Sequence, residues 1–192
     1  IKKILLTGGN GMVGKNFIKA SKNINFKILS PNSKKLNLQN YNLTNEFLKK
    51  NKPDIIVHCA AKVGGIQQNI KNPVKMMVEN IDIAKNIIMS ARENNIKKLI
   101  NVASSCMYPH QAKNPLDENL ILTGTLEPTN EGYAIAKIFS ARLCEYISRE
   151  DKNFEYKTII PPNLYGSFDS FEPHKSHAIA SIINKIYHAK IN

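Results

Sequence analysis

The chain alternates between short apolar runs and longer stretches in which apolar residues recur every three or four positions. The short runs are rich in Ile, Leu and Val, and several lie next to Gly, Pro or Asn, which predicts buried strands. The longer stretches predict helices that bury one face. We expect strands at residues 3–7, 26–29, 54–58, 98–103 and 157–161, and helices at residues 12–20, 44–50, 73–94, 130–150 and 176–189.

The order of these elements bears on the fold class. Strands that alternate with helices form βαβ units, and such units build a parallel sheet in an α/β domain. Thr44 is expected to cap the second helix, and Pro73 suits the first turn of the third. Residues 109–128 lack periodicity and are predicted to form a loop over a site. The 192 residues suit one domain with a packed core.

A glycine-rich turn follows the first predicted strand. Gly8, Gly11 and Gly14 form a GxxGxxG pattern between that strand and the first predicted helix. Glycines permit a tight turn and a close approach of the backbone to a diphosphate, which the helix N-terminus then binds through free N–H groups. In this position the pattern predicts a dinucleotide site in a Rossmann-type doubly wound sheet, with a plain structural turn as the alternative. The residues expected to hold the cofactor there are Gly8, Gly9, Asn10, Gly11, Met12, Val13 and Gly14.

The residues after the second predicted strand bear on which dinucleotide binds. An Asp or Glu at that place holds the ribose hydroxyls of NAD. Here the stretch is Ser-Pro-Asn-Ser-Lys-Lys at residues 30–35, with no acidic residue and two lysines. Asn32 and Lys34 are therefore expected to bind the additional phosphate of NADP(H). An ordinary solvated loop is the alternative.

A Ser, a Tyr and a Lys in the second half of the chain form a candidate catalytic set. Tyr133 and Lys137 are four residues apart on one predicted helix, and Ser104 follows the fourth predicted strand. A cationic Lys favours the phenolate and is expected to lower the pKa of Tyr133, while the Ser hydroxyl can hold a carbonyl oxygen. The set suits hydride transfer between a nicotinamide and a carbonyl carbon. A Tyr–Lys pair with this spacing also occurs on ordinary surface helices.

Longer motifs make the chain resemble one family. They are HCAAKVGGI at residues 58–66, SSCMYP at 104–109, GTLEPTNE at 124–131, YAIAK at 133–137, PNLYG at 162–166 and SH at 176–177. Together they are similar to the GDP-L-fucose synthase family within the extended short-chain dehydrogenase/reductase superfamily. That family epimerises GDP-4-keto-6-deoxy-mannose at C3 and C5 and then reduces C4 with NADPH.

The resemblance implies a role for each residue that matches a family motif. Tyr133 would give a proton to the C4 oxygen, Lys137 would hold the nicotinamide ribose, and Ser104 would bind the keto oxygen. Cys106 would be the base of the epimerisation and His177 its acid. The cofactor would also contact Ala60, Ala61, Val102, Ala103, Ser104, Ser105, Tyr133, Lys137, Pro161, Pro162, Asn163, Leu164 and His177. The substrate would contact Ser105, Cys106, Asn163, His177 and Lys185.

Departures from the family pattern leave the sugar open. Residues 167–171 read SFDSF where the family has a GPxDNF-type string, and Ala180 replaces a Pro. The alternative substrate is a GDP-4-keto-heptose, reduced at C4 without epimerisation in bacterial surface polysaccharide biosynthesis. A non-enzymatic dinucleotide-binding regulator is a third hypothesis, which the complete set of Ser104, Tyr133 and Lys137 disfavours.

Domain organisation and assembly follow from the same resemblance. Residues 1–175 are expected to form the NADP-binding domain with the catalytic residues. Residues 176–192 are expected to begin a smaller C-terminal substrate domain that is largely absent from this chain. The long predicted helices at residues 73–94 and 130–150 resemble those that pair in dimers of this superfamily, which predicts a homodimer.

The charge of the chain suggests a different partner, a nucleic acid. The formal net charge is +12, from 27 basic and 15 acidic residues, but only Arg92, Arg142 and Arg149 are arginines. Base readout favours Arg. The scattered lysines therefore indicate a solvated surface that at most favours small anionic ligands, and no nucleic-acid partner is predicted.

The remaining features bear on metal binding and location. Cys59, Cys106 and Cys144 form no CxxC or zinc pattern, which predicts no metal site and a reduced, cytoplasmic protein. No apolar run reaches the roughly 18 residues of a membrane helix, so no membrane partner is expected. The N-terminus lacks the pattern of a signal peptide.

Overall fold

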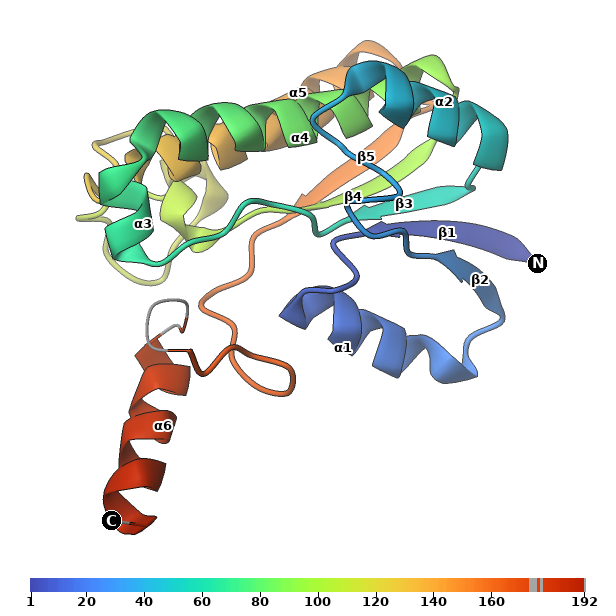
Figure 1. The fold of residues 1–192 in the computed structure, drawn as a ribbon. Helices are drawn as coiled ribbons and strands as arrows, with labels where there is room; N and C mark the ends of the chain where they lie inside the picture. Colours follow the sequence, from blue (N-terminus) through green and yellow to red (C-terminus); the bar gives the residue numbers. More distant parts are fainter. Residues whose placement is uncertain (173–175, 177, 192) are drawn as a thin grey trace.

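The computed structural model describes residues 1–172, 176 and 178–191. Within these residues the strands form one parallel sheet in the order β2-β1-β3-β4-β5 (Figure 1). The strands are β1 (Lys2–Thr7), β2 (Phe26–Leu29), β3 (Ile55–His58), β4 (Lys98–Val102) and β5 (Glu155–Ile159). Each strand is paired in parallel with its neighbours, so the predicted parallel sheet is confirmed.

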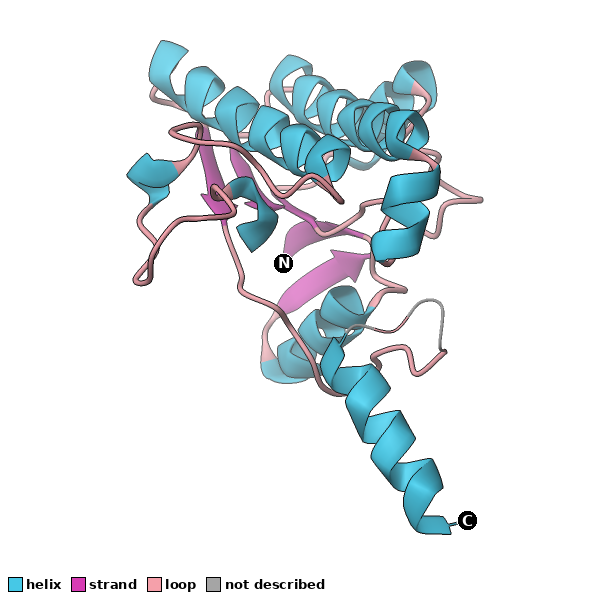
Figure 2. Ribbon diagram, turned by 90° about the vertical axis from the view of Figure 1, so that its left-hand side faces the viewer, coloured by secondary structure: helices cyan, strands magenta, loops and turns pink. Residues whose placement is uncertain are grey.

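Helices cover the two faces of the sheet unequally. One face carries α1 (Met12–Ala20), and the other carries α2 (Tyr41–Asn51), α4 (Pro73–Glu93) and α5 (Glu131–Glu150) (Figures 1 and 2). The chain crosses from β1 to β2 in one direction along the sheet, and from β2 onward in the opposite direction. Because parallel crossovers are right-handed, opposite directions place helices on opposite faces. The predicted α/β class with a doubly wound, Rossmann-type sheet is therefore confirmed.

The main hydrophobic core lies between the sheet and the layer of α2, α4 and α5. Leu5 and Ile56 are fully buried in it, together with Ile87 of α4. The alternate strand residues Ile4 and Leu6 belong to a separate cluster that packs with α1. The central strands β1 and β3 are thus apolar on both sides, which explains why they read as continuous apolar runs in the sequence.

The start of α2 differs from the prediction. The cap of this helix is Asn40 and not Thr44, because the Asn40 side chain accepts a hydrogen bond of 3.0 Å from the N–H of Leu43. Thr44 lies inside the helix, where it is buried and its hydroxyl donates to the carbonyl of Asn40 at 2.8 Å. Asn is at least as strong an N-cap as Thr, so the sequence offered Asn40 as an equally good N-cap for this helix.

Other boundaries shift by a few residues, and one helix was not predicted. β5 begins at Glu155, two residues before the predicted start. A short helix, α3 (Ile66–Lys71), precedes α4, and a 3₁₀ turn (Glu118–Leu120) lies within the predicted loop. The segment of α3 lies between Gly65 and Pro73, which leaves room for less than two helical turns. So short a segment shows no recognisable helical period in the sequence.

The last helix, α6 (Ala178–Ile191), leads away from the sheet (Figure 1). No helix among the described residues is long and apolar enough to cross a membrane. Cys59, Cys106 and Cys144 are free thiols. The cytoplasmic location itself stays a prediction.

Candidate active site

A cleft of about 750 Å³ opens at the carboxyl ends of the strands. Its lining comes from the start of α1, from the loops after β3, β4 and β5, and from α5. The chain reverses its direction across the sheet between the neighbouring strands β1 and β3. Ligands of doubly wound sheets bind at such a switch point, so the cleft is the candidate site.

The turn between β1 and α1 has no room for side chains at two of its glycines. Gly8 has a φ of +73°, and a Cβ there would lie 2.7 Å from the backbone nitrogen of Ala60. A Cβ on Gly14 would lie 2.4 Å from the carbonyl oxygen of Gly8, so α1 packs directly against the turn. Gly11 is the N-cap residue of α1, whose first N–H groups have no acceptor within the helix. This cradle fits the diphosphate of a dinucleotide.

The end of β2 lies beside this turn. A Cβ on Gly9 would lie 1.8 Å from the hydroxyl oxygen of Ser30, so the Ser30 side chain borders the turn directly. Asn32 accepts a hydrogen bond of 3.0 Å from the N–H of Lys35, and Lys34 is exposed. Asn32 and Lys34 were predicted to contact the cofactor, but Ser30 was not. Its position directly after the strand was the available signal.

A buried polar pair joins the carboxyl ends of β1 and β3. The Oγ1 atom of Thr7 lies 2.8 Å from Nδ1 of His58 and accepts a hydrogen bond of 3.3 Å from the N–H of Ala60. Burial, and then the positive charge of Lys137, lower the pKa of His58 to about 3, so its ring is neutral at neutral pH. This hydrogen-bonded pair connects the start of the glycine turn with the neighbouring strand β3. Neither residue was predicted to belong to the site.

Lys137 is buried in the wall of the cleft, with 7% of its surface exposed. Its ammonium donates a hydrogen bond of 2.9 Å to the carbonyl of Val102 and lies 5.6 Å from the centre of the Tyr133 ring. Burial lowers the pKa of Lys137 to about 8, although Cys106 and Cys59 act in the opposite direction. The structure brings Lys137 and Tyr133 together, as their spacing predicts.

Burial also dominates the pKa of Tyr133. Desolvation raises this pKa above its ordinary value, and the negative charge of a Cys106 thiolate would raise it further. The expectation that Lys137 lowers the pKa of Tyr133 is therefore wrong for this structure, because the ammonium bonds to a backbone carbonyl instead of the phenol. At neutral pH the phenol carries its proton and can act as a proton donor.

Ser104 and Cys106 lie on the turn after β4. Ser104 caps a short 3₁₀ helix (Ser105–Met107), and its hydroxyl oxygen accepts a hydrogen bond of 3.5 Å from the N–H of Cys106. Burial raises the pKa of the Cys106 thiol, although hydrogen bonding to Ser104 acts in the opposite direction. Both residues line the cleft together with Tyr133, so these predicted catalytic residues share one cavity.

Ten of the other predicted contact residues also lie on the cleft, whereas Gly8, Gly9, Asn10, Gly11, Gly14, Asn32, Lys34 and Ala60 are not among its lining residues. Its lining includes Met12, Val13, Ala61, Val102, Ala103, Ser105, Pro161, Pro162, Asn163 and Leu164. Lys185 is exposed on α6 and is not among the residues that line the cleft. His177 lies outside the described residues, so its predicted role stays a prediction.

Asn80 of α4 holds the loop that carries the VGGI motif. Its side-chain oxygen accepts a hydrogen bond of 2.7 Å from the N–H of Lys62. Its side-chain nitrogen donates to the carbonyl of Lys62 at 3.0 Å and to that of Met76 at 2.7 Å. The buried amide thus fixes one wall of the cleft. A single Asn within a helix forms no motif, so this residue was not predicted.

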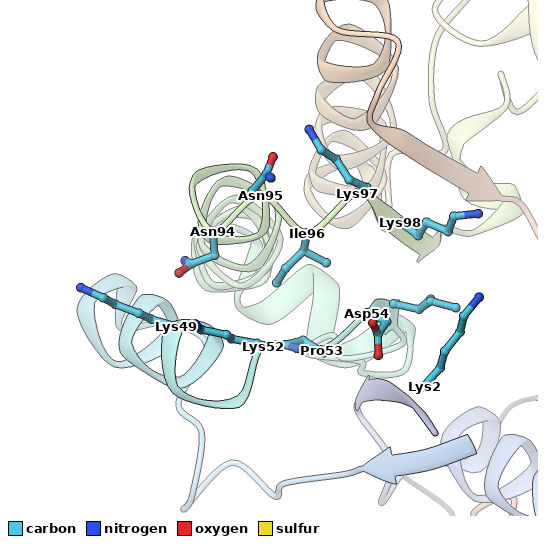
Figure 3. A pocket seen from close by; sticks show the side chains of 11 residues that line it. Lys2, Lys49, Lys52, Pro53, Asp54, Asn94, Asn95, Ile96, Lys97 and Lys98 are labelled. Atoms are coloured by element: carbon cyan, nitrogen blue, oxygen red, sulfur yellow. The ribbon is translucent and has the colours of Figure 1, made fainter. Parts of the chain in front are cut away.

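A second cavity, of about 550 Å³, lies at the amino ends of the strands, on the side opposite to the cleft, where α2 and α4 end (Figure 3). Several lysines line it, but the ammonium ends of Lys49, Lys97 and Lys98 point away from one another (Figure 3). Cations are stabilised near helix C-termini by the helix dipole, which accounts for lysines at this edge. The cavity lacks the converging groups that an anion site needs, and it contains none of the predicted site residues.

Sequence comparison shows which proteins the chain resembles. The pattern of the NAD dependent epimerase/dehydratase family matches residues 4–192. The chain is 53% identical to a GDP-L-colitose synthase of Yersinia pseudotuberculosis, over 96% of the chain and 60% of the relative. It is 44% identical to a GDP-L-fucose synthase of Azorhizobium caulinodans, over 98% of the chain and 60% of the relative. The chain thus spans about 60% of the length of these curated relatives.

Solved structures show the same likeness. A GDP-mannoheptose C4 reductase from Campylobacter jejuni with NADP bound has a TM-score of 0.90 and 29% identity, over 99% of this chain and 56% of that chain. A GDP-L-fucose synthetase from Naegleria fowleri bound to NADP has a TM-score of 0.88 and 28% identity, over 98% of this chain and 62% of that chain. The similarity therefore extends over nearly all of the elements that surround the cleft.

Proposed function

The chain belongs to the NAD dependent epimerase/dehydratase family, and on this premise we propose that it forms the cofactor-binding and catalytic part of an NADPH-dependent nucleotide-sugar oxidoreductase. The proposed reaction is reduction at C4, with epimerisation at C3 and C5, of a GDP-4-keto-6-deoxy-mannose-type sugar. The observation that carries the proposal is the convergence of Ser104, Tyr133 and Lys137 on one cleft beside the glycine turn. The relatives named GDP-L-colitose synthase and GDP-L-fucose synthase support the GDP-sugar class.

NADP(H) is the proposed cofactor. The turn at residues 8–14 would hold its diphosphate, and Asn32 and Lys34 would hold its additional phosphate. No acidic residue follows β2 to select NAD. The similar structures named as NADP complexes support this choice. When bound, NADPH supplies the hydride of the reduction.

The residues of the cleft account for the proton of the reduction. C4 gains a hydride and its oxygen gains a proton. Tyr133, which is protonated at neutral pH, gives its phenolic proton to that oxygen, while the hydroxyl of Ser104 orients the carbonyl. The ammonium of Lys137 bonds to the carbonyl of Val102 and lies 5.6 Å from the centre of the Tyr133 ring, and its proposed role is to hold the nicotinamide ribose.

The epimerisation would use Cys106 as base and His177 as acid. The C4 ketone acidifies the C–H bonds at C3 and C5, so a base on one side of the ring removes a proton and an acid on the other side returns one. Cys106 lines the cleft next to Ser104. Burial raises the pKa of its thiol, so the rate of epimerisation is expected to rise with pH as the thiolate forms.

Residues 1–175 are proposed to form the cofactor domain, and residues 176–192 to begin the substrate-binding portion. α6 supports this division because it leads away from the sheet and exposes an apolar side (Figure 1). Lys185 on this helix is exposed, and we propose that it meets the anionic nucleotide sugar. Its partner group would be a phosphate of the GDP moiety.

A GDP-4-keto-heptose is the second candidate substrate, reduced at C4 without epimerisation. The likeness to the GDP-mannoheptose C4 reductase favours it. Residues 167–171, which depart from the fucose synthase pattern, are consistent with a different sugar end of the cleft.

NMR of the product after reaction with NADPH in deuterated buffer tests the proposal. With GDP-4-keto-6-deoxy-mannose we expect consumption of NADPH and deuterium at C3 and C5. Reduction of a GDP-4-keto-heptose without deuterium at either carbon would favour the second candidate. If no GDP-4-keto sugar consumes NADPH, the proposal is overturned in favour of a dinucleotide-binding regulator.

We also propose that two copies of the protein pair through the outer sides of α4 and α5. Val74 and Val78 of α4 expose 71% and 45% of their surface, and Ile135 of α5 is also exposed. Light scattering is expected to give the mass of two copies, and a variant with Val74→Lys and Val78→Lys is expected to be monomeric. A monomer mass for the unmodified protein would contradict the proposal.

A further inference from the structure

Asn130 is a residue of the cleft whose side chain has no hydrogen-bond partner in the described part of the chain. It lies at the start of α5, and its Oδ1 atom is buried. Its backbone is fully used, because its N–H donates to the carbonyl of Glu127 at 3.1 Å and its carbonyl accepts from the N–H of Ala134 at 3.0 Å. The unused bonding capacity therefore belongs to the side chain alone.

The position of Asn130 makes this unusual. An Asn at the N-cap of a helix ordinarily accepts a hydrogen bond from an N–H of the first turn. Asn40 does so at the start of α2, whereas Asn130 occupies the same position of α5 and makes no such bond. Buried polar atoms in proteins are nearly always bonded, because an unpaired one costs free energy. The Nδ2 atom of the same amide also has no partner among the described residues and is not enclosed, so rotation of this side chain on the cleft wall lets a ligand bond to either atom of the amide.

The order of residues along α5 indicates which ligand that is. Lys137 lies about one turn after Tyr133 and bonds to Val102 at the end of β4, close to the strand ends that carry the cofactor cradle. Asn130 lies about one turn before Tyr133, beside the loop that contains Glu127. The two residues thus flank the proton donor. The cofactor end of the cleft is at Lys137, and Asn130 is at the sugar end.

We propose that Asn130 binds a ring hydroxyl of the sugar close to C4 and thereby orients and selects the substrate. Its amide offers one acceptor and two donors, and a sugar hydroxyl both donates and accepts. The inference rests on the proposed function, which assigns the cleft to a GDP-4-keto sugar. It adds a contact to the carbon skeleton, apart from the keto oxygen that Ser104 and Tyr133 address.

The test compares Asn130→Ala with Asn40→Ala in the whole protein. The side chain of Asn40 caps α2 and does not line the cleft, so N40A is expected to lower the melting temperature and to leave ligand binding unchanged. N130A removes no cap bond and is expected to keep the melting temperature. It is expected to weaken the binding of GDP-mannose about tenfold in calorimetry, with the affinity for NADPH unchanged.

GDP-mannose is the probe because it has the ring hydroxyls but no ketone, so its binding does not depend on turnover. Equal affinities of N130A and the unmodified protein for GDP-mannose would overturn the inference. A parallel loss of NADPH affinity or of thermal stability would also overturn it, because the side chain would then have a structural role.

Turnover separates this inference from the proposed function. With GDP-4-keto-6-deoxy-mannose, N130A is expected to raise KM about tenfold and to change kcat less. A protein that binds GDP-mannose through Asn130 but reduces no GDP-4-keto sugar would refute the proposed reaction and retain the contact. A protein that binds no GDP-mannose and reduces no GDP-4-keto sugar would refute both.

Discussion

Burial, more than the charge of neighbouring residues, sets the protonation of the cleft residues. It raises the pKa values of Tyr133 and Cys106 and lowers the pKa of Lys137 to about 8. Each shift favours the neutral form, as expected for groups removed from water. The phenol and the thiol therefore keep their protons at neutral pH. This suits Tyr133 as a proton donor to a carbonyl oxygen, whereas Cys106 has to lose its proton before it can act as a base.

Replacement of Tyr133 by Phe tests this proton donor. The variant keeps the ring but loses the hydroxyl, so kcat is expected to fall about 100- to 10,000-fold, the range of general acid catalysis. The affinity for NADPH, measured by fluorescence titration, is expected to stay the same. Tyr146→Phe is the matched control, because Tyr146 is an exposed tyrosine of the same helix. Unchanged turnover in Y133F would contradict the assignment.

The lowered pKa of Lys137 predicts a dependence of stability on pH. Below pH 8 both the folded and the unfolded chain carry the proton on Lys137, and between about 8 and 10.5 only the unfolded chain carries it. The unfolded chain binds more protons in this window, so this residue makes stability rise with pH. Urea unfolding of the unmodified protein and of Lys137→Met at several pH values measures the contribution of Lys137 to the free energy of unfolding.

The free energy of unfolding of the unmodified protein, minus that of K137M, is expected to increase across this pH window. Other titrating groups largely cancel in the difference, since both chains contain them. A difference that stays flat across the window would mean that Lys137 is not buried as the structure has it.

At the scale of elements, the contact between α1 and the glycine turn makes Gly14 more sensitive than Gly11. A Cβ on Gly14 would lie 2.4 Å and 2.5 Å from backbone atoms of Gly8 and Gly9, whereas a Cβ on Gly11 would meet only the carbonyl oxygen of Gly8 at 3.4 Å. Gly14→Ala is therefore expected to lower stability by about 1–3 kcal/mol, the range of overpacked sites. It is also expected to weaken NADPH binding.

Thermal melting of Gly14→Ala and Gly11→Ala checks this difference. Gly11→Ala is expected to melt close to the unmodified protein, because the φ of Gly11 is −80° and a Cβ there fits at ordinary contact distance. An equal decrease in melting temperature in the two variants would contradict this prediction. It would mean that the conformation of the turn, and not its close packing against α1, makes the glycines necessary for stability.

Elements with a strong local signal were predictable, and those that depend on distant contacts were not. β2 is a short run rich in apolar residues and α1 has a helical apolar period, so both were predicted with the bounds that the structure shows. Motif residues such as Ser104 and Tyr133 were placed in one cleft because strand ends and helix spacing determine where they lie. Thr7 and His58 are 51 residues apart and meet only because β1 and β3 are neighbours.

The same limit applies to the amides of the site. Asn80 belongs to no recognised motif, and Asn130 lies in the GTLEPTNE motif but was given no role there. Their roles follow from what their side chains bond or fail to bond. The pKa of Tyr133 was predicted in the wrong direction for a related reason. Spacing showed that a Lys is near, but only the folded chain shows how deeply both groups are buried.

At the scale of the whole molecule, two apolar surfaces lack cover in the described part of the chain. One is the face of the sheet that α1 leaves bare, where Ile100 and Ile159 are exposed. The other is a stripe along α6, which includes Ile182 and Ile186. Parallel sheets are ordinarily covered on both faces, and large apolar patches mark surfaces that other structure covers. The chain spans about 60% of the length of its curated relatives.

The stripe on α6 can be tested in the chain of 192 residues. Ile182 and Ile186 are 54% and 64% exposed and lie four residues apart on one side of the helix. Replacing both by Lys is expected to reduce the fluorescence of a bound hydrophobic dye and to leave the melting temperature unchanged, since neither side chain is part of a buried core. Ile87→Ala is the contrasting variant. Because Ile87 is fully buried, it is expected to cost about 2–5 kcal/mol. A lower melting temperature in the double Lys variant would mean that α6 packs against the sheet domain, and the proposed division at residue 175 would then be wrong.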